Sequence, residues 1–436
     1  MTEWIGAAEA AQRLGIKPAS LYSYVSRGVL APRRGSDGRA SLFDAAQIED
    51  LARRGKPRRA AGGAELVIES ELTEIADDRL RFRGHDAIAL ATSRSFEEVA
   101  SLLWTGSFDD PSTKGPWRAT GEAIAAGTAA QAALPPDTYP LERLQVIVPA
   151  VAATDRLRLH LDRPAVIAAA SGLIAAMADC LPAAGPRAAV AGDDSAAVVG
   201  PHSAVAGDDS AAVDGVDSAA VAGDDSIAGR LATKLCQRRP SAGLVAALRA
   251  ALVLAADHEL AASTLAARVA ASVRADPYAV VGTGLGTMSG ALHGGASLGA
   301  EVLLASASGP ADAPRVVGEL LRRGERIPGL GHFVYQTGDP RAMLLLDLIR
   351  AAAPDSGRLA VAEAVLAEAG RRALPAPNIE LALAVLASVA GMVPGAGEAV
   401  FAVARTAGWL AHALEEYARA TPIRPRGVYI GQPAIS

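Results

Sequence analysis

Alanine-rich segments with helical periodicity make up most of this chain and constrain its fold more than any other feature. Apolar residues recur at three- and four-residue intervals in the stretches 96–106, 299–307, 341–352 and 399–420. Half of all residues are hydrophobic but only 4% are aromatic, and alanine costs no side-chain entropy in a helix. Strand-like alternation is scarce. The pattern predicts an all-α protein, and a length of 436 residues predicts two to three domains.

Several features bear on where such a chain works. Cys180 and Cys236 lie far apart and match no metal or redox motif, which favours a reducing compartment. The start of the chain, MTEWIGAAEA, has neither a basic stretch nor a long apolar core, so it predicts no secretion signal. The apolar runs are too short and interrupted to span a bilayer. We therefore expect a cytoplasmic protein without a membrane partner.

The net charge of −5 is unevenly distributed along the chain. Residues 1–60 carry eleven Lys and Arg against six Asp and Glu, a net charge of +5, which leaves −10 for the remainder. A basic head on an acidic body indicates two separate tasks, and basic heads often bind nucleic acid.

Residues 1–58 show the pattern of a small helix-turn-helix domain. A first helix is expected over 7–14, ended by Gly15, and a second near Pro18, whose fixed φ suits a first helical turn. In this motif the second helix reads DNA, and its candidate contacts are Lys17, Ser20, Ser23 and Arg27. A small helical docking module is the alternative interpretation, but the basic charge favours DNA.

The rest of the head fits the same motif. Residues 31–43 predict a two-stranded wing with glycine at its turn, and 44–55 predict a closing helix with Asp44 as its N-cap. Together these features resemble the winged helix-turn-helix domains of the MerR and excisionase type. A short linker, 59–64, would join this domain to a body that begins at residue 65.

A low-complexity repeat interrupts the body. The sequence VAGDDSAAV occurs at 190–198 and 205–213, and VAGDDSIAG occurs at 221–229. Eight aspartates and no Lys or Arg lie between residues 190 and 228, so we expect a disordered surface insertion over 187–227. Calcium binding by the acidic units is the weaker alternative, because their spacing matches no known calcium loop.

Three histidines of the body lie in short motifs with chemical character. ADHELAAST places His258 between two acids, GALHGGA places His293 before an expected helix, and PGLGHFVYQTGDPRA holds His332. The groups that follow are a carboxylate and three arginines: Glu380, Arg341, Arg405 and Arg424. Singly, each has an ordinary structural explanation. Together they predict a site for a small polyanion, because arginine clamps carboxylates and histidine donates to carbonyls.

Metal binding is the rival interpretation of the histidines. No HxxxH or HxH spacing supports it, and the arginines would repel a cation. We therefore predict no metal site.

The order of these motifs strongly resembles the citrate synthase family. The resemblance rests on LRFRGHDAIALATSRSFEEVASLLWTG, ADHE, GALHGGA, PGLGHFVY with DPRA, PNIEL, ARTAGW and RPR with YIG. It implies an all-α homodimer whose large domain spans about 65–292 and 386–436 and whose small domain spans about 293–385, with the active site in the cleft between them. The family condenses acetyl-CoA with oxaloacetate to give citrate and CoA. Propionyl-CoA would give 2-methylcitrate, and no cofactor is implied beyond the acyl-CoA substrate.

The resemblance also implies roles for the three histidines. His258 matches the residue that contacts oxaloacetate, and His293 matches the one that stabilises the enol of acetyl-CoA. His332 matches the histidine that polarises the oxaloacetate carbonyl. A helix N-terminus disfavours imidazolium, so a neutral His293 can donate a hydrogen bond to the thioester oxygen.

The arginines match positions that bind the carboxylates of oxaloacetate in the family. Arg341 and Arg405 correspond to clamps within the subunit, and Arg424 corresponds to an arginine that the partner subunit contributes. The glycines around His332 would let the backbone approach the substrate closely.

Three positions depart from the family pattern. The family's catalytic base is an aspartate in PNVD, whereas this chain has Glu380, and a misplacement of about 1 Å can cost roughly a hundredfold in rate. Bacterial members usually read HRVYK where this chain reads HFVYQ, so Phe333 and Gln336 replace two cations that resemble CoA phosphate contacts. These departures leave a DNA-binding metabolite sensor with a weakened body as the alternative. The retained site favours an acyl-CoA condensing enzyme over the sensor and over a purely structural module.

Overall fold

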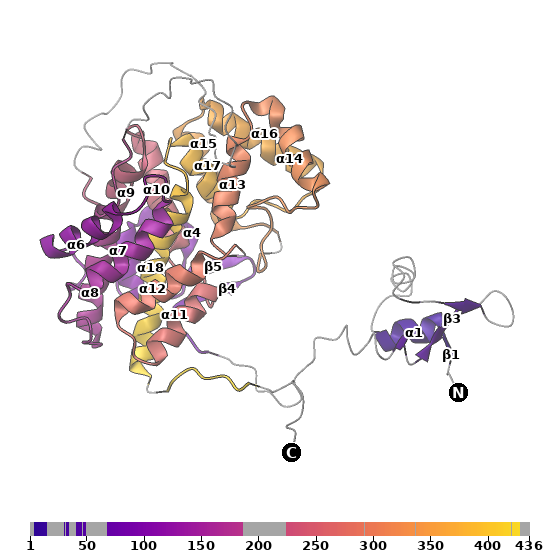
Figure 1. Ribbon diagram of the computed structural model, residues 1–436, viewed down its shortest axis with the longest axis horizontal. Coiled ribbons are helices and arrows are strands. Elements are labelled where there is room, and N and C mark those ends of the chain that lie inside the picture. The colour runs from indigo at the N-terminus through magenta and orange to yellow at the C-terminus, as the bar shows by residue number, and fades with distance from the viewer. Residues whose placement is uncertain are drawn as a thin grey trace. The chain divides into compact units, whose positions relative to one another are not determined.

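The computed structural model divides into two compact units, residues 1–68 and 69–436. The residues that it describes are 4–14, 30, 32–34, 41–45, 47–48, 68–185, 224–291, 293–335, 337–419 and 421–427 (Figure 1). The expected linker 59–64 and the four candidate DNA contacts lie outside them.

The described part of the first unit is a small sheet with one helix. Strands β1 (Trp4–Gly6) and β2 (Arg33–Arg34) both pair antiparallel with β3 (Ser41–Asp44), and α1 (Ala7–Leu14) follows β1. The expected first helix and the two-stranded hairpin are therefore present. β1 was not expected, and Asp44, predicted to cap a helix, closes β3 instead.

The second unit opens with a small antiparallel sheet that the composition did not indicate. β4 (Thr73–Ala76), β5 (Arg79–Phe82) and β6 (His85–Asp86) pair in that order. Asp77 and Asp78 join β4 to β5 with positive φ values of 52° and 56°, the conformation of a tight hairpin turn. The expectation of an all-α protein is thus correct for the body's helices and wrong for these short sheets.

Helices form the rest of the described part of this unit. The first set is α4 (Ala87–Ser93), α5 (Phe96–Thr105), α6 (Gly121–Ala132), α7 (Pro140–Ala152), α8 (Arg163–Asp179), α9 (Ile227–Leu235), α10 (Ala242–Ala255), α11 (Ala262–Ser272) and α12 (Pro277–Met288). The second set is α13 (Gly295–Ala305), the short 3₁₀ helix η1 (Pro310–Asp312), α14 (Ala313–Arg322), α15 (Pro340–Ala352), α16 (Gly357–Arg371), α17 (Ile379–Val389) and α18 (Ala396–Ala418). No helix among the described residues is long and apolar enough to cross a membrane.

The core is organised around α18, whose side chains are buried along nearly its whole length. It packs against α5, α7, α8, α10, α11, α12 and α17, and Figure 1 shows it in yellow within the helical body, with α13 to α17 gathered on one side. Small residues make this packing close. A Cβ added to Gly284 of α12 would lie 2.6 Å from the Trp409 ring, so only glycine fits there.

The end of the repeat belongs to the fold, which corrects the expected insertion boundary of 187–227. Ser226 caps α9 by accepting from the Gly229 N–H, and Ile227 is fully buried. Asp225 forms ion pairs with Arg118 and Arg230. The expectation of disorder therefore fails for 224–227, and the preceding residues 186–223 lie outside the described part.

We expect Gly284→Ala to destabilise the protein by about 1–3 kcal/mol, because the added methyl overpacks against Trp409. The matched control is Gly286→Ala, two residues along the same helix, where nothing lies within 4 Å of the added Cβ. Alanine is the better helix residue by about 0.5–1 kcal/mol, so the control should be neutral or stabilising. Melting temperatures of both variants check this, and an equal fall in both would contradict it.

Candidate active site

Glycines hold the loop of His332 against the start of α17. Gly329 and Gly331 have φ values of 76° and 84°, and a Cβ on Gly329 would lie 2.6 Å from the Leu381 Cβ. The Gly331 N–H donates to the Ala376 carbonyl at 2.8 Å, and the Asn378 N–H donates to the Gly329 carbonyl at 2.9 Å. The glycine frame therefore brings His332 close to the first turn of α17.

Three aromatic rings from this loop and from His258 pack together. The centroids of His258 and His332 are 5.1 Å apart, and the Tyr335 ring lies 5.6 Å from His258 and 4.7 Å from His332. His258 Nε2 and the Tyr335 hydroxyl are 3.0 Å apart. Burial, followed by the charges of Arg341 and Arg405, holds the pKa of His258 well below its usual range, so this imidazole is neutral.

The protonation of His332 follows from its neighbours. Its Nδ1 accepts from the Val334 N–H at 3.0 Å, so the proton of the neutral ring lies on Nε2. Burial and Arg341 lower the pKa of His332. Arg341 Nη2 stands 3.4 Å from that Nε2, and because guanidinium can only donate, the two groups present donors side by side. Such a pair suits one shared acceptor oxygen.

Arg341 already has a buried partner in Asp339. Its Nε and Nη2 donate to the two Asp339 carboxylate oxygens at 2.9 and 2.8 Å, and the same carboxylate accepts from the Ile379 N–H at 2.9 Å. Burial opposes the charge on Arg341, but Asp339 outweighs it and raises the pKa of the guanidinium. Arg341 is therefore an anchored cation and not a free clamp.

Arg405, in contrast, is a buried guanidinium with unused donors. It is 1% exposed, its Nε donates to the Ala255 carbonyl at 2.8 Å, and it lies over the Phe401 ring at 4.5 Å. Both of its Nη atoms are buried and find no partner among the described residues. Burial lowers the pKa of Arg405 to about 10. Unsatisfied buried donors of this kind are costly without an acceptor.

His293 stands immediately before α13 and is oriented from behind. Its Nε2 lies 2.7 Å from the Ser263 hydroxyl, which also accepts from Trp409 Nε1 at 3.3 Å. Because the Ser263 oxygen accepts from Trp409, its own proton is free to point to His293, which would leave the histidine proton on Nδ1. Burial and then Arg405 lower the pKa of His293 to about 4, so the ring is neutral near pH 7.

Glu380 lies in the first turn of α17, where Asn378 is the N-cap. Burial raises the pKa of its carboxyl to about 7, against the opposing charge of Arg341. The Asn378 side-chain amide is 3.5 Å from the carboxylate. A half-protonated carboxyl at neutral pH is a well-matched proton acceptor.

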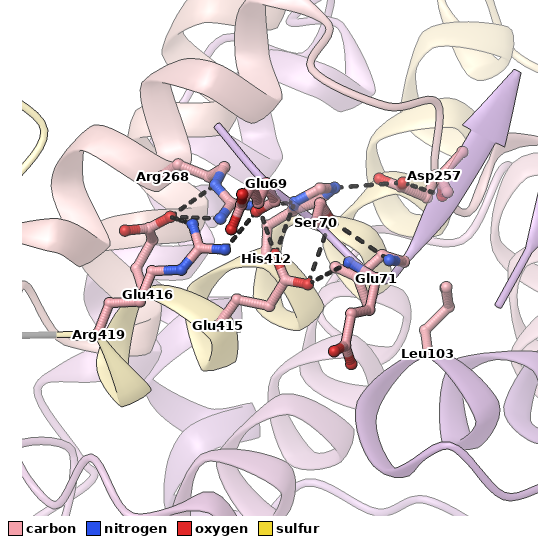
Figure 2. A network of polar contacts seen from close by, with 12 residues as sticks. Glu69, Ser70, Glu71, Leu103, Asp257, Arg268, His412, Glu415, Glu416 and Arg419 are labelled. Carbon is pink, nitrogen blue, oxygen red and sulfur yellow. Dashed lines mark hydrogen bonds and ion pairs between the residues drawn. The ribbon is translucent and has the colours of Figure 1, made fainter. Parts of the chain in front are cut away.

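A buried polar network lies behind these groups (Figure 2). Asp257, the neighbour of His258 in the sequence, accepts from Thr73 Oγ1 and stands 3.3 Å from His412 Nε2. Arg268 lies 2.5 Å from His412 Nδ1 and pairs with Glu415 and Glu416. The network therefore fixes Asp257, whose charge acts on Arg405.

The structure brings six of the seven predicted site residues together. Arg424 is the exception, because it is exposed in the segment 421–427 and no contact with the other six is seen in the described part of the chain. Sequence reasoning also missed four participants: Tyr335, Asp339, Asp257 and Ser263. Each lies within five residues of a predicted site residue, and that proximity was the available signal.

Comparisons with known proteins agree with this geometry. The family model "Citrate synthase, C-terminal domain" matches residues 63–426. A citrate synthase of Haloferax volcanii is 31% identical over 397 residues, covering 84% of this chain and 94% of the relative. A 2-methylcitrate synthase of Shewanella oneidensis is 33% identical over 214 residues, covering 48% of this chain and 56% of the relative.

The fold is shared with solved structures. A ternary complex of citrate synthase from Thermoplasma acidophilum with carboxymethyl coenzyme A and oxaloacetate aligns with a TM-score of 0.64 at 21% identity, over 86% of this chain and 96% of that one. The chain therefore has the citrate synthase fold, and the family match shows that it belongs to the citrate synthase family.

The two buried arginines should respond differently to the same substitution. Arg341→Leu leaves Asp339 buried without its partner, which typically costs about 3–5 kcal/mol. Arg405→Leu removes a guanidinium whose Nη donors are unpaired, so the free protein should lose much less stability. Chemical denaturation of the ligand-free variants checks this, and equal losses would contradict the pairing described above.

Proposed function

We propose that this chain is an acyltransferase that condenses an acyl-CoA with oxaloacetate, giving citrate from acetyl-CoA or 2-methylcitrate from propionyl-CoA, and releasing CoA. The observation that carries the proposal is the pair of buried, unpartnered Nη donors of Arg405, set among neutral histidines and close enough to Arg341 for their charges to interact. A small dianion with a carbonyl group fits these donors. The acyl-CoA is a substrate, and the chemistry calls for no further cofactor.

The proposed steps use three groups of this chain. Glu380 removes a proton from the carbon next to the thioester carbonyl, while neutral His293 donates a hydrogen bond to the thioester oxygen. The resulting enol carbon attacks the oxaloacetate carbonyl, which His332 Nε2–H polarises, and the new alkoxide takes up a proton. Water then cleaves the thioester, which releases CoA and the tricarboxylate.

Substrate binding is proposed to involve both domains of the body and a second subunit. Arg405 and Arg341 would hold the oxaloacetate carboxylates, with His258 beside them. For Arg424, the preceding Ile423 N–H donates to Ser272 Oγ at the end of α11 at 3.0 Å. Exposed Val269 and Val273 lie on and just after the same helix. This apolar surface supports a homodimer in which Arg424 reaches the partner's site.

The acyl group stays open between acetyl and propionyl. Phe333, which stands where bacterial relatives carry a cation, is fully exposed beside His332, and Gln336 lies outside the described residues. The loss of cationic contacts at these positions predicts weaker CoA binding. Thiol release with oxaloacetate and each acyl-CoA is the experiment that tests the function and ranks the two substrates.

The pH dependence of the reaction should report on Glu380. Only the ionised carboxylate can accept a proton, and burial raises its pKa from 4.5 to about 7. We therefore expect kcat to rise with pH and level off above about pH 7. Glu380→Gln should remove nearly all turnover while calorimetry shows nearly unchanged oxaloacetate affinity, because the arginines carry that binding.

The conservative variant separates the enzyme from the sensor. If the site is adapted to glutamate, Glu380→Asp shortens the reach and slows the reaction. A faster aspartate variant, or wild-type turnover that is negligible with both acyl-CoAs, would move the protein toward a metabolite sensor.

We further propose that residues 1–58 form a winged helix-turn-helix domain that binds duplex DNA. The net charge of +5 over residues 1–60 and the α1 helix with its β2–β3 hairpin support this proposal. The recognition residues Lys17, Ser20, Ser23 and Arg27 are carried over from the sequence alone.

DNA binding by the full-length protein should be weak and should fall steeply as salt rises, because Lys and Arg displace counterions from phosphates. Lys17→Ala and Arg27→Ala should both weaken it in fluorescence anisotropy. Arg13→Ala is the control, because Arg13 is paired with Glu9 at 2.6 Å within α1. Absence of binding at low salt would make the head a protein-docking module.

A further inference from the structure

The Tyr335 side chain occupies a position in the site that the sequence motifs do not account for. It is 4% exposed, and its ring packs against His258 and His332. The Arg341 guanidinium lies over the same ring, 5.5 Å from its centroid. Tyr335 thus contacts three of the residues proposed to hold oxaloacetate.

The hydroxyl of Tyr335 lies at the polar end of this cluster. It is 3.0 Å from His258 Nε2, and the positive charges of Arg341 and Arg405 both act on it. Burial raises the pKa of Tyr335 to about 12 despite these charges, so the group is a neutral phenol throughout the physiological range. A phenol can accept one hydrogen bond and donate another at the same time.

From this placement we propose that Tyr335 is a substrate-binding residue whose hydroxyl donates directly to a carboxylate of oxaloacetate, with His258 behind it as the group that orients the hydroxyl. The inference rests on the proposed function and adds a donor to its site. It also changes the role of His258 from a substrate contact to a positioning residue.

The direction of the hydrogen bonds follows from the charge of the ligand. A carboxylate can only accept, so the Tyr335 O–H must point toward it when the ligand is bound. The remaining partner, His258 Nε2, must then donate to the Tyr335 oxygen. His258 is neutral, so a ring protonated at Nε2 supplies that donor without any change of charge. In the free protein the hydroxyl can point to His258 instead, and binding of the anion selects the reverse direction.

Removal of the hydroxyl alone tests the proposal. Tyr335→Phe keeps the ring that packs on the two histidines and on Arg341, so the fold of the loop should survive. Loss of a hydrogen bond to a charged acceptor should weaken oxaloacetate binding by roughly tenfold or more. In calorimetry the Kd for oxaloacetate should rise by that factor, and in steady-state kinetics the KM for oxaloacetate should rise while the KM for acyl-CoA stays nearly constant.

A control variant accounts for the general effect of losing a buried tyrosine hydroxyl. Tyr417 donates to the Ala275 carbonyl at 2.6 Å and is also buried, and it is not part of the proposed site. Tyr417→Phe should therefore leave oxaloacetate affinity unchanged even if it lowers the melting temperature.

A double-mutant cycle separates the two roles for His258. If His258 acts through the hydroxyl, His258→Ala should weaken oxaloacetate binding in the wild type but have little further effect in Tyr335→Phe. If His258 contacts the substrate itself, the two losses should add. The pH profile of the Kd is a second readout, since a phenol with a pKa of about 12 leaves it flat from pH 6 to pH 9 on this account.

The outcomes distinguish this inference from the function on which it rests. If wild-type protein does not bind oxaloacetate, the proposed function fails. If wild type binds and Tyr335→Phe binds equally well, or more tightly because the hydroxyl competes with the ligand, the inference about Tyr335 is wrong and the proposed function stands. Additive losses in the cycle would also overturn it.

Discussion

The arrangement of the site depends on one unfavourable group, the buried guanidinium of Arg405. Moving such a charge out of water costs several kcal/mol unless partners replace the lost hydration. The protein supplies only part of that replacement, through the Ala255 carbonyl, the Phe401 ring and the charge of Asp257. The unused Nη donors are what make the site suited to an anion, because a carboxylate can supply the missing acceptors.

The charges behind Arg405 alternate in sign from the site outward. Asp257 follows Arg405, the neutral His412 bridges to Arg268, and Glu415 and Glu416 neutralise Arg268 in turn. Each buried charge therefore has an opposite charge near it, which limits the cost of burying the whole network. Only Arg405, at the end nearest the histidines, is left partly unpaired.

One helix provides much of this arrangement, and its spacing is visible in the sequence. Arg405, Gly408, Trp409, His412 and Glu416 occur at intervals of three, one, three and four residues, which places them along one face of α18. A Cβ on Gly408 would lie 2.4 Å from the Asp257 Oδ1, so the absent side chain is what allows Asp257 to approach. The face is polar although the helix is buried, and buried polar faces of this kind have to be matched by partners elsewhere in the fold.

Sequence reasoning succeeded where a motif fixes both the residue type and its local backbone. The Gly-framed loop of His332 and the positions of His258, His293, Arg341, Glu380 and Arg405 could all be predicted, and the structure brings them together. It failed where the outcome depends on contacts distant in the chain. The pairing of Arg341 with Asp339 could not be told from a free clamp, since both give the same DPRA motif.

The small sheets and the insertion boundary show the same limit. Strands of two to four residues are too short for alternation to be distinguished from chance. The third repeat copy has the same acidic composition as the others, yet its aspartates become part of the fold because Arg118 and Arg230 lie opposite Asp225. Composition alone cannot register a partner that is contributed by another segment.

Glu380 carries a physical tension that bears on whether the body is an enzyme. A carboxyl whose pKa rises from 4.5 to about 7 in the folded state destabilises the fold as the pH increases between those values, because the unfolded chain ionises first. Glu301 also has a raised pKa of about 7, but its carboxylate accepts from the Gly395 and Gly397 N–H groups at 2.7 and 3.0 Å. Glu380 has only the distant Asn378 amide. A buried, poorly solvated carboxylate contributes nothing to stability at pH 7, whereas a base that must take a carbon-bound proton needs that environment. The burial of Glu380 is therefore better explained by catalysis than by a weakened site that serves only to sense metabolites.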